Sequence, residues 1–102
     1  MKIHVQQFTF NPFQENTYIV YSDNGDAVII DPGCYERYEE EELTDFIASK
    51  NLTVHALLNT HAHIDHVLGN AFVLDNYPVD FYMHPLDVVT LNSVQNYAHL
   101  YG

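Results

Sequence analysis

The chain has 102 residues, a length that allows one domain with a modest core. Hydrophobic residues make up 47% of it and aromatic residues 14%, which indicates a globular chain and excludes a disordered one. Its 14 acidic residues against 3 basic ones give a formal net charge of −11. Such a surface repels phosphate groups, so we expect no nucleic-acid partner and no anionic membrane partner.

Cysteine usage and the start of the chain bear on the compartment. Cys34 is the single cysteine and has no partner in the chain for a disulfide. The chain does not begin with positively charged residues followed by an apolar run, so we expect no secretory signal and no membrane span. We therefore expect a cytoplasmic protein, in which Cys34 is an ordinary small residue because no base nearby would activate it as a nucleophile.

The first third of the chain predicts three strands. Apolar residues alternate from Lys2 to Phe10, with a slip at Gln6 and Gln7 that predicts a bulge. Residues 17–21 and 27–30 are rich in β-branched and aromatic side chains and predict the next two strands. Between them, Asn24-Gly25 predicts a hairpin with a type I′ turn, in which both central residues have positive φ.

Asp31-Pro32-Gly33 ends the third predicted strand sharply. A carboxylate at the end of a buried strand is placed to orient a metal-bound histidine through a hydrogen bond. Aspartate is also a common turn residue, with no further role. From the residues alone, both interpretations of Asp31 stay open.

Residues 36–50 predict a helix, since acidic side chains crowd its first turns and Lys50 lies at its end, as the helix dipole favours. Its predicted inward face is formed by Leu43, Phe46 and Ile47. The run Glu39 to Glu42 offers four carboxylates, but successive helical residues point in different directions around the axis. We therefore expect a solvated face there and no cation site.

The second half of the chain alternates strands and helices. Residues 52–59 predict a strand, in which we expect His55 to be a packed or edge histidine. A helix over 67–76 and a strand over 79–83 follow, and His84-Pro85 opens a last helix. Apolar residues cover more than one face of that helix, so something should cover the second face: further polypeptide, a second copy of the chain or a bound segment.

Four potential metal ligands, His61, His63, Asp65 and His66, fall within six consecutive residues. In an extended or turning loop, His61 and His63 point the same way and can reach one ion, while Asp65 and His66 are left to reach a second. Imidazole nitrogen and carboxylate oxygen suit zinc, and also iron or manganese. Histidines that merely bond their neighbours are a weaker explanation of so dense a cluster.

These residues resemble the His-x-His-x-Asp-His signature of the metallo-β-lactamase-fold hydrolases, and the flanking Thr60 and Gly69 are most similar to its glyoxalase II branch. Asn16-Thr17-Tyr18 and Asp31-Pro32-Gly33 are weaker matches. The resemblance implies an α/β fold, the N-terminal half of a metallo-β-lactamase-like αββα sandwich with the order β-β-β-α-β-α-β-α. We expect residues 1–102 to form a single domain that is truncated or naturally shortened.

The resemblance also implies how the site works. His61 and His63 would hold the first zinc ion, Asp65 and His66 the second, and Asp65 would also orient the nucleophile. A metal-activated hydroxide would then hydrolyse a small acyl thioester such as a hydroxyacylglutathione. The three further ligands that complete the family's site, two histidines and a bridging aspartate, have no match in this chain.

Two other interpretations stay open. The first is a catalytically incomplete metal-binding fragment that self-associates as a homo-oligomer and so covers its last helix. The second is an acidic structural domain that binds no metal, against which the histidine cluster argues. Metal content per chain separates the second from the others, and turnover of a thioester separates the first from an enzyme.

Overall fold

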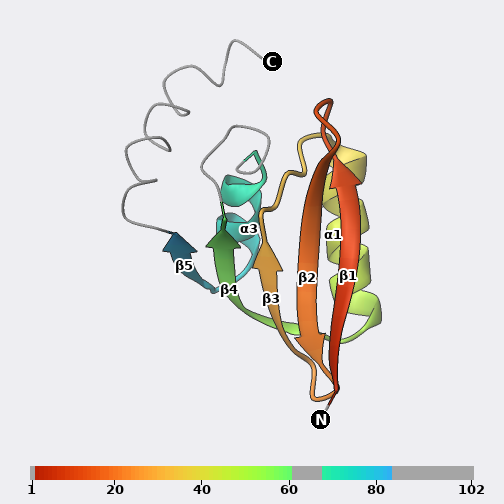
Figure 1. The fold of residues 1–102 in the computed structure, drawn as a ribbon, viewed down its shortest axis with the longest axis vertical. Coiled ribbons are helices and arrows are strands. Elements are labelled where there is room, and N and C mark those ends of the chain that lie inside the picture. The colour runs from red at the N-terminus through yellow and green to blue at the C-terminus, as the bar shows by residue number, and fades with distance from the viewer. Residues whose placement is uncertain (1, 61–67, 84–102) are drawn as a thin grey trace.

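The computed structural model describes residues 2–60 and 68–83, so the predicted ligands at 61–66 and the predicted last helix lie outside the described residues. The described part is a five-stranded sheet with helices packed against it (Figure 1). Its elements in chain order are β1 (Ile3–Phe10), β2 (Glu15–Ser22), β3 (Asp26–Ile30), α1 (Arg37–Ser49), β4 (Thr53–Asn59), α3 (Asn70–Asn76) and β5 (Asp80–Met83).

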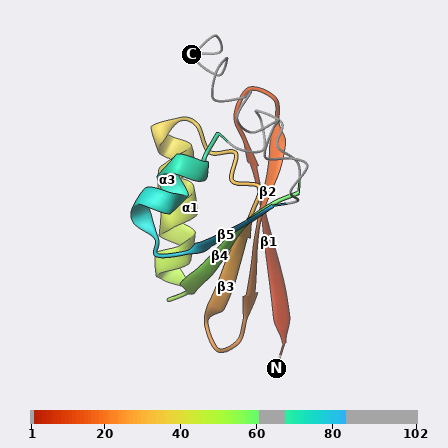
Figure 2. The same cartoon turned by 90° about the vertical axis from the view of Figure 1, so that its left-hand side faces the viewer.

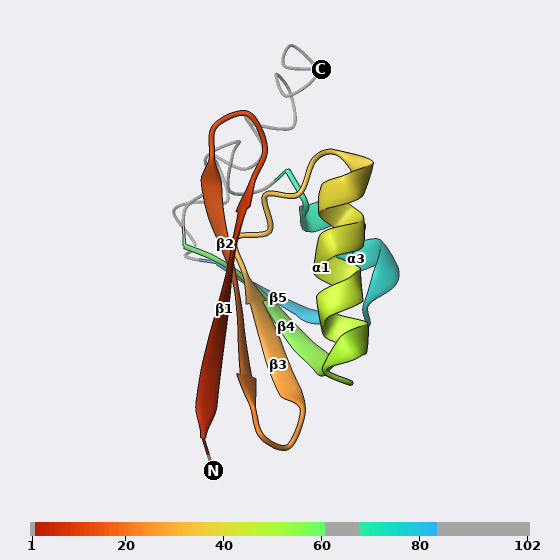
Figure 3. The ribbon, with the colours of Figure 1, turned by 90° about the vertical axis from the view of Figure 1, so that its right-hand side faces the viewer.

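The strands lie in the order β1-β2-β3-β4-β5. The first three form an antiparallel meander, whereas β4 runs parallel to β3 and β5 runs parallel to β4. The crossovers between parallel strands contain α1 and α3, and Figures 2 and 3 show both helices on the same face of the sheet. One helical layer on one sheet is the predicted half of an αββα sandwich, and the predicted order of elements is confirmed as far as β5.

The core lies between the sheet and the helices. Ile19, Ile29 and Leu57 come from three neighbouring strands, are paired across the sheet by register, and are each 0% exposed. Burying a side chain of this size stabilises a fold by about 1.5–3 kcal/mol. The helices complete this core with buried apolar side chains, namely Leu43 and Ile47 from α1 and Val73 from α3.

The predicted inward face of α1 is confirmed. Leu43 and Ile47 are buried, and Phe46 packs edge-on against two aromatic rings of the sheet. The ring centroids of Phe46 and Phe8 are 5.6 Å apart, and those of Phe46 and Tyr21 are 5.7 Å apart. Aromatic pairs in this geometry stabilise the contact beyond the area that they bury.

The predicted bulge at Gln6 and Gln7 is wrong, because β1 pairs with β2 without a register shift from Ile3 to Phe10. His4 and Gln6 lie on the same helix-facing row of β1 as Phe8 and Phe10. Because these two residues are polar, the alternation of apolar side chains is interrupted in the sequence although the strand is regular. The ring of His4 stacks on Tyr21 at 5.0 Å. The irregularity that does occur lies between Ala27 and Val28, opposite β4.

The predicted hairpin at Asn24-Gly25 is confirmed, but its type I′ turn is wrong. Gly25 has a φ of +88°, whereas Asn24 is not among the described residues with positive φ. The amide of Gly25 donates to the carbonyl of Ser22 at 3.0 Å, in a loop of three residues between β2 and β3. In three-residue loops only the last position is left-handed, so glycine is needed there alone.

Helix α3 begins at Asn70, later than the predicted start at residue 67. The cause is a close approach at Gly69. Its amide donates to the carbonyl of Pro32 at 2.7 Å, and a Cβ at this position would lie 2.5 Å from Cys34 Sγ. Only glycine allows this contact, which fixes the start of α3 against the 32–34 segment.

Candidate metal-binding site

Strands β3 and β4 end side by side and bring Asp31 and Thr60 to the same edge of the sheet. Because the two strands are parallel, their carboxyl ends meet there. The amide of Asp31 donates to the carbonyl of Leu58 at 2.8 Å, which extends the pairing by one residue. Thr60 directly precedes His61, so the predicted metal-binding segment begins at this edge of the sheet.

Asp31 holds the entry to that segment. Its side chain is buried, its Oδ1 accepts the backbone amide of Thr60 at 2.7 Å, and its Oδ2 accepts the hydroxyl of Thr60. Of the two interpretations that the sequence left open, the one in which Asp31 is a turn residue with no further role is wrong, because its side chain binds Thr60. Its described contacts fix the residue before His61, while any contact with a histidine of the segment lies outside the described residues.

The other end of the segment is held as well. Asn59, the last residue of β4, and Asn70, the first residue of α3, form a buried pair of reciprocal amide hydrogen bonds. Asn59 donates to Asn70 at 3.2 Å and accepts from it at 2.7 Å. This pair therefore keeps the neighbouring residues Thr60 and Gly69, which flank the segment, close to each other in the fold.

Thr17 connects this edge to β2. Its side chain is 0% exposed, and its Oγ1 accepts the amide of Gly33 at 2.9 Å. The same oxygen lies 2.8 Å from the carbonyl of Asp31 and 2.8 Å from Oε2 of the buried Glu15. Sequence reasoning used Thr17 as a strand residue and as part of a weak family match, and it assigned no contact to the hydroxyl. A hydroxyl on the inward-facing row of β2 is a signal that could have identified this role.

A cavity of about 370 Å³ opens beside Thr60. Strand and loop residues from the first half of the chain form most of its wall, and Phe13 also borders a smaller apolar cavity of about 120 Å³. The larger cavity is lined by Phe13, Gln14, Glu15, Asn16, Tyr18, Ile30, Asp31 and Thr60. Its size and its mixture of apolar and polar walls suit a small organic ligand next to the predicted metal-binding segment.

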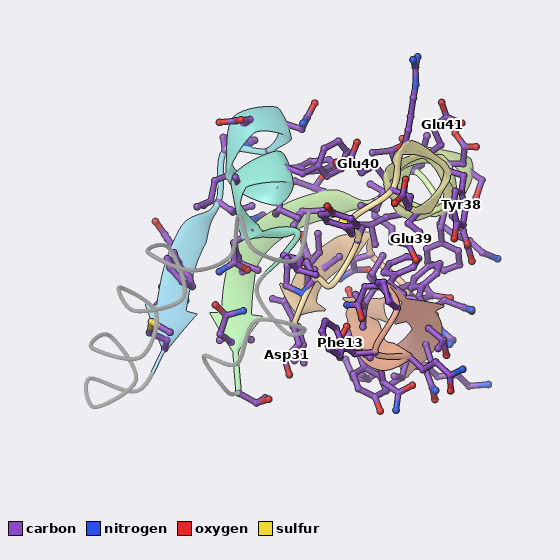
Figure 4. All side chains as sticks on the ribbon, turned by 90° about the horizontal axis from the view of Figure 1, so that it is seen from above. Phe13, Asp31, Tyr38, Glu39, Glu40 and Glu41 are labelled. Atoms are coloured by element: carbon purple, nitrogen blue, oxygen red, sulfur yellow. The ribbon has the colours of Figure 1, made fainter. Side chains whose placement is uncertain are left out.

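The loop that carries Phe13 is anchored by Glu39, for which the predicted solvated face is wrong. Glu39 is 4% exposed and lies between α1 and this loop, whereas Glu41 lies on the outer side of the helix (Figure 4). Its carboxylate accepts the amides of Asn11 at 2.6 Å, Tyr35 at 2.9 Å and Glu36 at 3.1 Å. The prediction holds for Glu41 and Glu42, which are exposed.

The physical reason for this exception is the position of Glu39 in α1. It is the third residue of the helix, and with Glu36 as the N-cap it forms a capping box. Its side chain therefore turns back toward unpaired amides at the helix start, which favour a negative charge. Asn11 reaches the same carboxylate because it lies in the β1–β2 turn with a φ of +59°.

Two histidines outside the predicted metal-binding segment are exposed or half-buried and pair with aspartates. His55 Nε2 lies 2.8 Å from Asp26, and His4 Nε2 lies 2.6 Å from Asp23, which lowers the pKa of the Asp23 carboxyl. His55 was predicted to be a packed or edge histidine, but it is exposed and lies on β4, which is an internal strand between β3 and β5. Among residues 2–60 and 68–83, no three histidine, cysteine or acidic side chains gather as a metal site.

Cys34 is 1% exposed. Burial raises the pKa of its thiol to about 12, and the negative charge of Glu40 adds to the shift. A thiol that stays protonated is a poor nucleophile. Its packing against Gly69 supports the expected role of Cys34 as a small core residue.

The family is decided by a comparison with known domains. The family model described as the metallo-beta-lactamase superfamily matches residues 10–93. The chain belongs to the metallo-beta-lactamase superfamily. It is 35% identical over 101 residues to the hydroxyacylglutathione hydrolase GloC of Haemophilus influenzae, a match that covers 98% of this chain and 46% of that protein. A hydroxyacylglutathione hydrolase of Buchnera aphidicola subsp. Schizaphis graminum is 37% identical over 75 residues, which cover 74% of this chain and 28% of that protein.

Solved structures of superfamily members agree with the fold. The crystal structure of TTHA1623 in a di-iron-bound form has a TM-score of 0.77 and 34% identity, covering 95% of this chain and 46% of that one. The B3 metallo-beta-lactamase BLEG-1 has a TM-score of 0.72 and 35% identity, covering 80% of this chain and 37% of that one. The chain thus spans less than half of the length of these relatives.

The predicted ligands His61, His63, Asp65 and His66 stay predictions, since they lie outside the described residues. What the structure describes is the frame that flanks them on both sides. In the described part of the chain no helix has the length and apolar character needed to cross a membrane.

Proposed function

We propose that this chain contributes the metal-binding half of a glyoxalase II-like hydrolase that cleaves small acyl thioesters. The observation that carries the proposal is the frame of the histidine-rich segment. Asp31 binds Thr60, the residue before the segment, Asn59 and Asn70 on its two sides bond to each other, and a cavity of about 370 Å³ opens beside Thr60. Similarity to two hydroxyacylglutathione hydrolases supports the choice of thioester.

The proposed ligands are His61 and His63 for one ion and Asp65 and His66 for a second. Three imidazoles and one carboxylate fit zinc, and they fit iron or manganese as well. When bound, such ions supply a nucleophile by lowering the pKa of a coordinated water, and they polarise the substrate carbonyl. Asp65 would in addition orient the attacking oxygen, and Asp31 would keep the segment in place through Thr60.

The proposed substrate is a small molecule that enters the cavity beside Thr60. Phe13, Tyr18 and Ile30 offer apolar walls for an acyl group, and Asn16 offers an amide for its polar substituents. A thiolate leaves readily, so the reaction does not need a dedicated general acid. The net charge of −11 supports a small substrate and argues against nucleic acid.

The test measures metal content per chain together with hydrolysis of a simple acyl thioester. We expect up to two ions per chain in the unmodified protein, and loss of binding at the first site when both His61 and His63 are replaced by alanine. The double variant His4→Ala with His55→Ala is the matched control, because both side chains pair with aspartates outside the predicted segment. Equal metal content in the two double variants would contradict the ligand assignment.

A second candidate is a metal-binding fragment without turnover that self-associates. The observation behind it is the sheet face opposite the helices, where Val5, Val20 and Val28 lie in one row and Tyr18 and Ile30 in the next. Of these, Val5 is 62% exposed and the other four are half-buried. Light scattering separates the candidates: a dimer that binds metal without hydrolysing thioesters supports the fragment, and a monomer that turns over supports the enzyme.

A further inference from the structure

The turn at residues 31–33 forms hydrogen bonds with the residues that flank the predicted metal-binding segment on both sides. The side chain of Asp31 binds the amide of Thr60 at 2.7 Å, at the start of the segment. The carbonyl of the next residue, Pro32, accepts the amide of Gly69 at 2.7 Å, just beyond its end. The position of the turn at residues 31–33 therefore sets where the segment leaves the sheet and where it returns.

This turn is bound by side chains from other parts of the chain. Asp31 has a φ of +53°, a left-handed conformation that is uncommon for residues other than glycine and that aspartate and asparagine adopt more readily than other residues do. Two side chains from outside the turn bind its backbone. Thr17 reaches Gly33 N at 2.9 Å and Asp31 O at 2.8 Å, and Asn11 Nδ2 donates to Gly33 O at 3.0 Å.

Thr17 is the more deeply placed of the two. It is 0% exposed, it belongs to the regular strand β2, and its hydroxyl contacts the backbone on both sides of Pro32. The hydroxyl has one proton, which it donates either to the carbonyl of Asp31 or to Glu15, 2.8 Å away. Its oxygen accepts from Gly33 in either case. Removing the hydroxyl leaves buried backbone groups without this partner.

We propose that Thr17 is a positioning residue for metal binding: its hydroxyl holds the Asp31–Gly33 turn, and the turn fixes Thr60 and Gly69 at the two ends of the histidine-rich segment. The inference rests on the proposed function in that this segment binds the metal. Partners that orient a ligand without touching the ion change metal affinity by about 10- to 100-fold when removed. Thr17 acts through a longer path, but it holds both ends of the segment at once.

The experiment compares Thr17→Val, which removes the hydroxyl at nearly constant shape, with Thr17→Ser, which keeps it. Thr9→Val is the matched control, since Thr9 is exposed on the neighbouring strand. The first measurement is amide hydrogen exchange. In Thr17→Val we expect the amides of Gly33 and Thr60 to exchange about tenfold faster relative to those of β3, the factor that corresponds to one lost hydrogen bond. Thr17→Ser should restore their protection.

The second measurement is zinc affinity by competition with a chelator, with Zn²⁺ as the only probe. We expect Thr17→Val to bind zinc about tenfold or more weakly than the unmodified chain, and Thr17→Ser and Thr9→Val to bind it normally. Unchanged Thr60 exchange and unchanged zinc affinity in Thr17→Val would overturn the proposal. A serine variant that behaves like the valine variant would overturn it too, because packing of the methyl group would then explain the loss.

A failure of the proposed function would give a different result from a failure of the proposal about Thr17. If the unmodified chain binds no zinc, the metal assignment fails, while Thr60 exchange still decides whether Thr17 holds the segment. If Thr17→Val does not fold, the unmodified chain provides the test by NMR. The buried Thr17 hydroxyl should then give a slowly exchanging proton signal close to the Gly33 amide, and rapid exchange of this proton with water would refute the contact.

Discussion

Glu39→Gln tests whether one carboxylate anchors the loop that carries Phe13. Oε1 of Glu39 accepts two amides, from Tyr35 and Glu36, and Oε2 accepts the amide of Asn11. Glutamine keeps one acceptor oxygen and places an NH₂ group where the second was. Whichever way the new amide turns, at least one buried N–H faces another donor, and the remaining bonds lose the assistance of the negative charge.

Hydrogen bonds to charged groups contribute about 1.5–3 kcal/mol each, and a buried donor left without an acceptor costs about 1–3 kcal/mol. With one bond lost and two weakened, we expect Glu39→Gln to lower the free energy of unfolding by about 2–4 kcal/mol. The assay is equilibrium denaturation in urea, followed by circular dichroism, with the slope of the transition checked for constancy.

The matched control is Glu42→Gln, which makes the same chemical change at an exposed position of the same helix. A surface change of this kind should alter the free energy of unfolding by less than about 0.5 kcal/mol. If the two variants are equally stable, the reasoning about the buried carboxylate is refuted.

Three further predictions concern the core and the titrating groups. Leu57→Ala, at a position that is 0% exposed, should destabilise the fold by about 2–5 kcal/mol in the same urea assay, and a loss below 1 kcal/mol would contradict its central place. Because the pKa of Cys34 is raised from its ordinary 9.0 to about 12, its thiol should resist a thiol reagent at pH 8 until the chain unfolds. The stability linked to this protonated thiol is fully present below pH 9.0 and is lost as the pH rises toward 12, so a flat stability profile in that window would argue against it. His4→Ala should raise the pKa of Asp23, because the hydrogen bond from His4 is the main cause of its lowered value, and NMR titration measures this change. The stability linked to the ionised carboxyl is present above its unfolded pKa and is lost as the pH falls.

The sequence alone determined the order of elements and the location of the proposed chemistry. Alternation over β1, β2 and β3, and the 3.6-residue spacing of Leu43 and Ile47 in α1, are local patterns, and local patterns decide which face of an element is buried. The cluster from His61 to His66 is likewise visible in the sequence, because ligand spacing within one loop does not depend on distant residues.

Only the tertiary structure decided which polar side chains support that loop. Glu39 and Asn11 are 28 residues apart, and Asp31 and Thr60 are 29 apart. Such contacts arise because strands and helices pack in one register, and a pattern within a single element carries no information about them. Glu39 therefore looked solvated beside Glu41 and Glu42, and Thr17 looked like an ordinary strand residue. Their backbone partners are supplied by other parts of the chain, which come close only when the sheet and α1 have assembled.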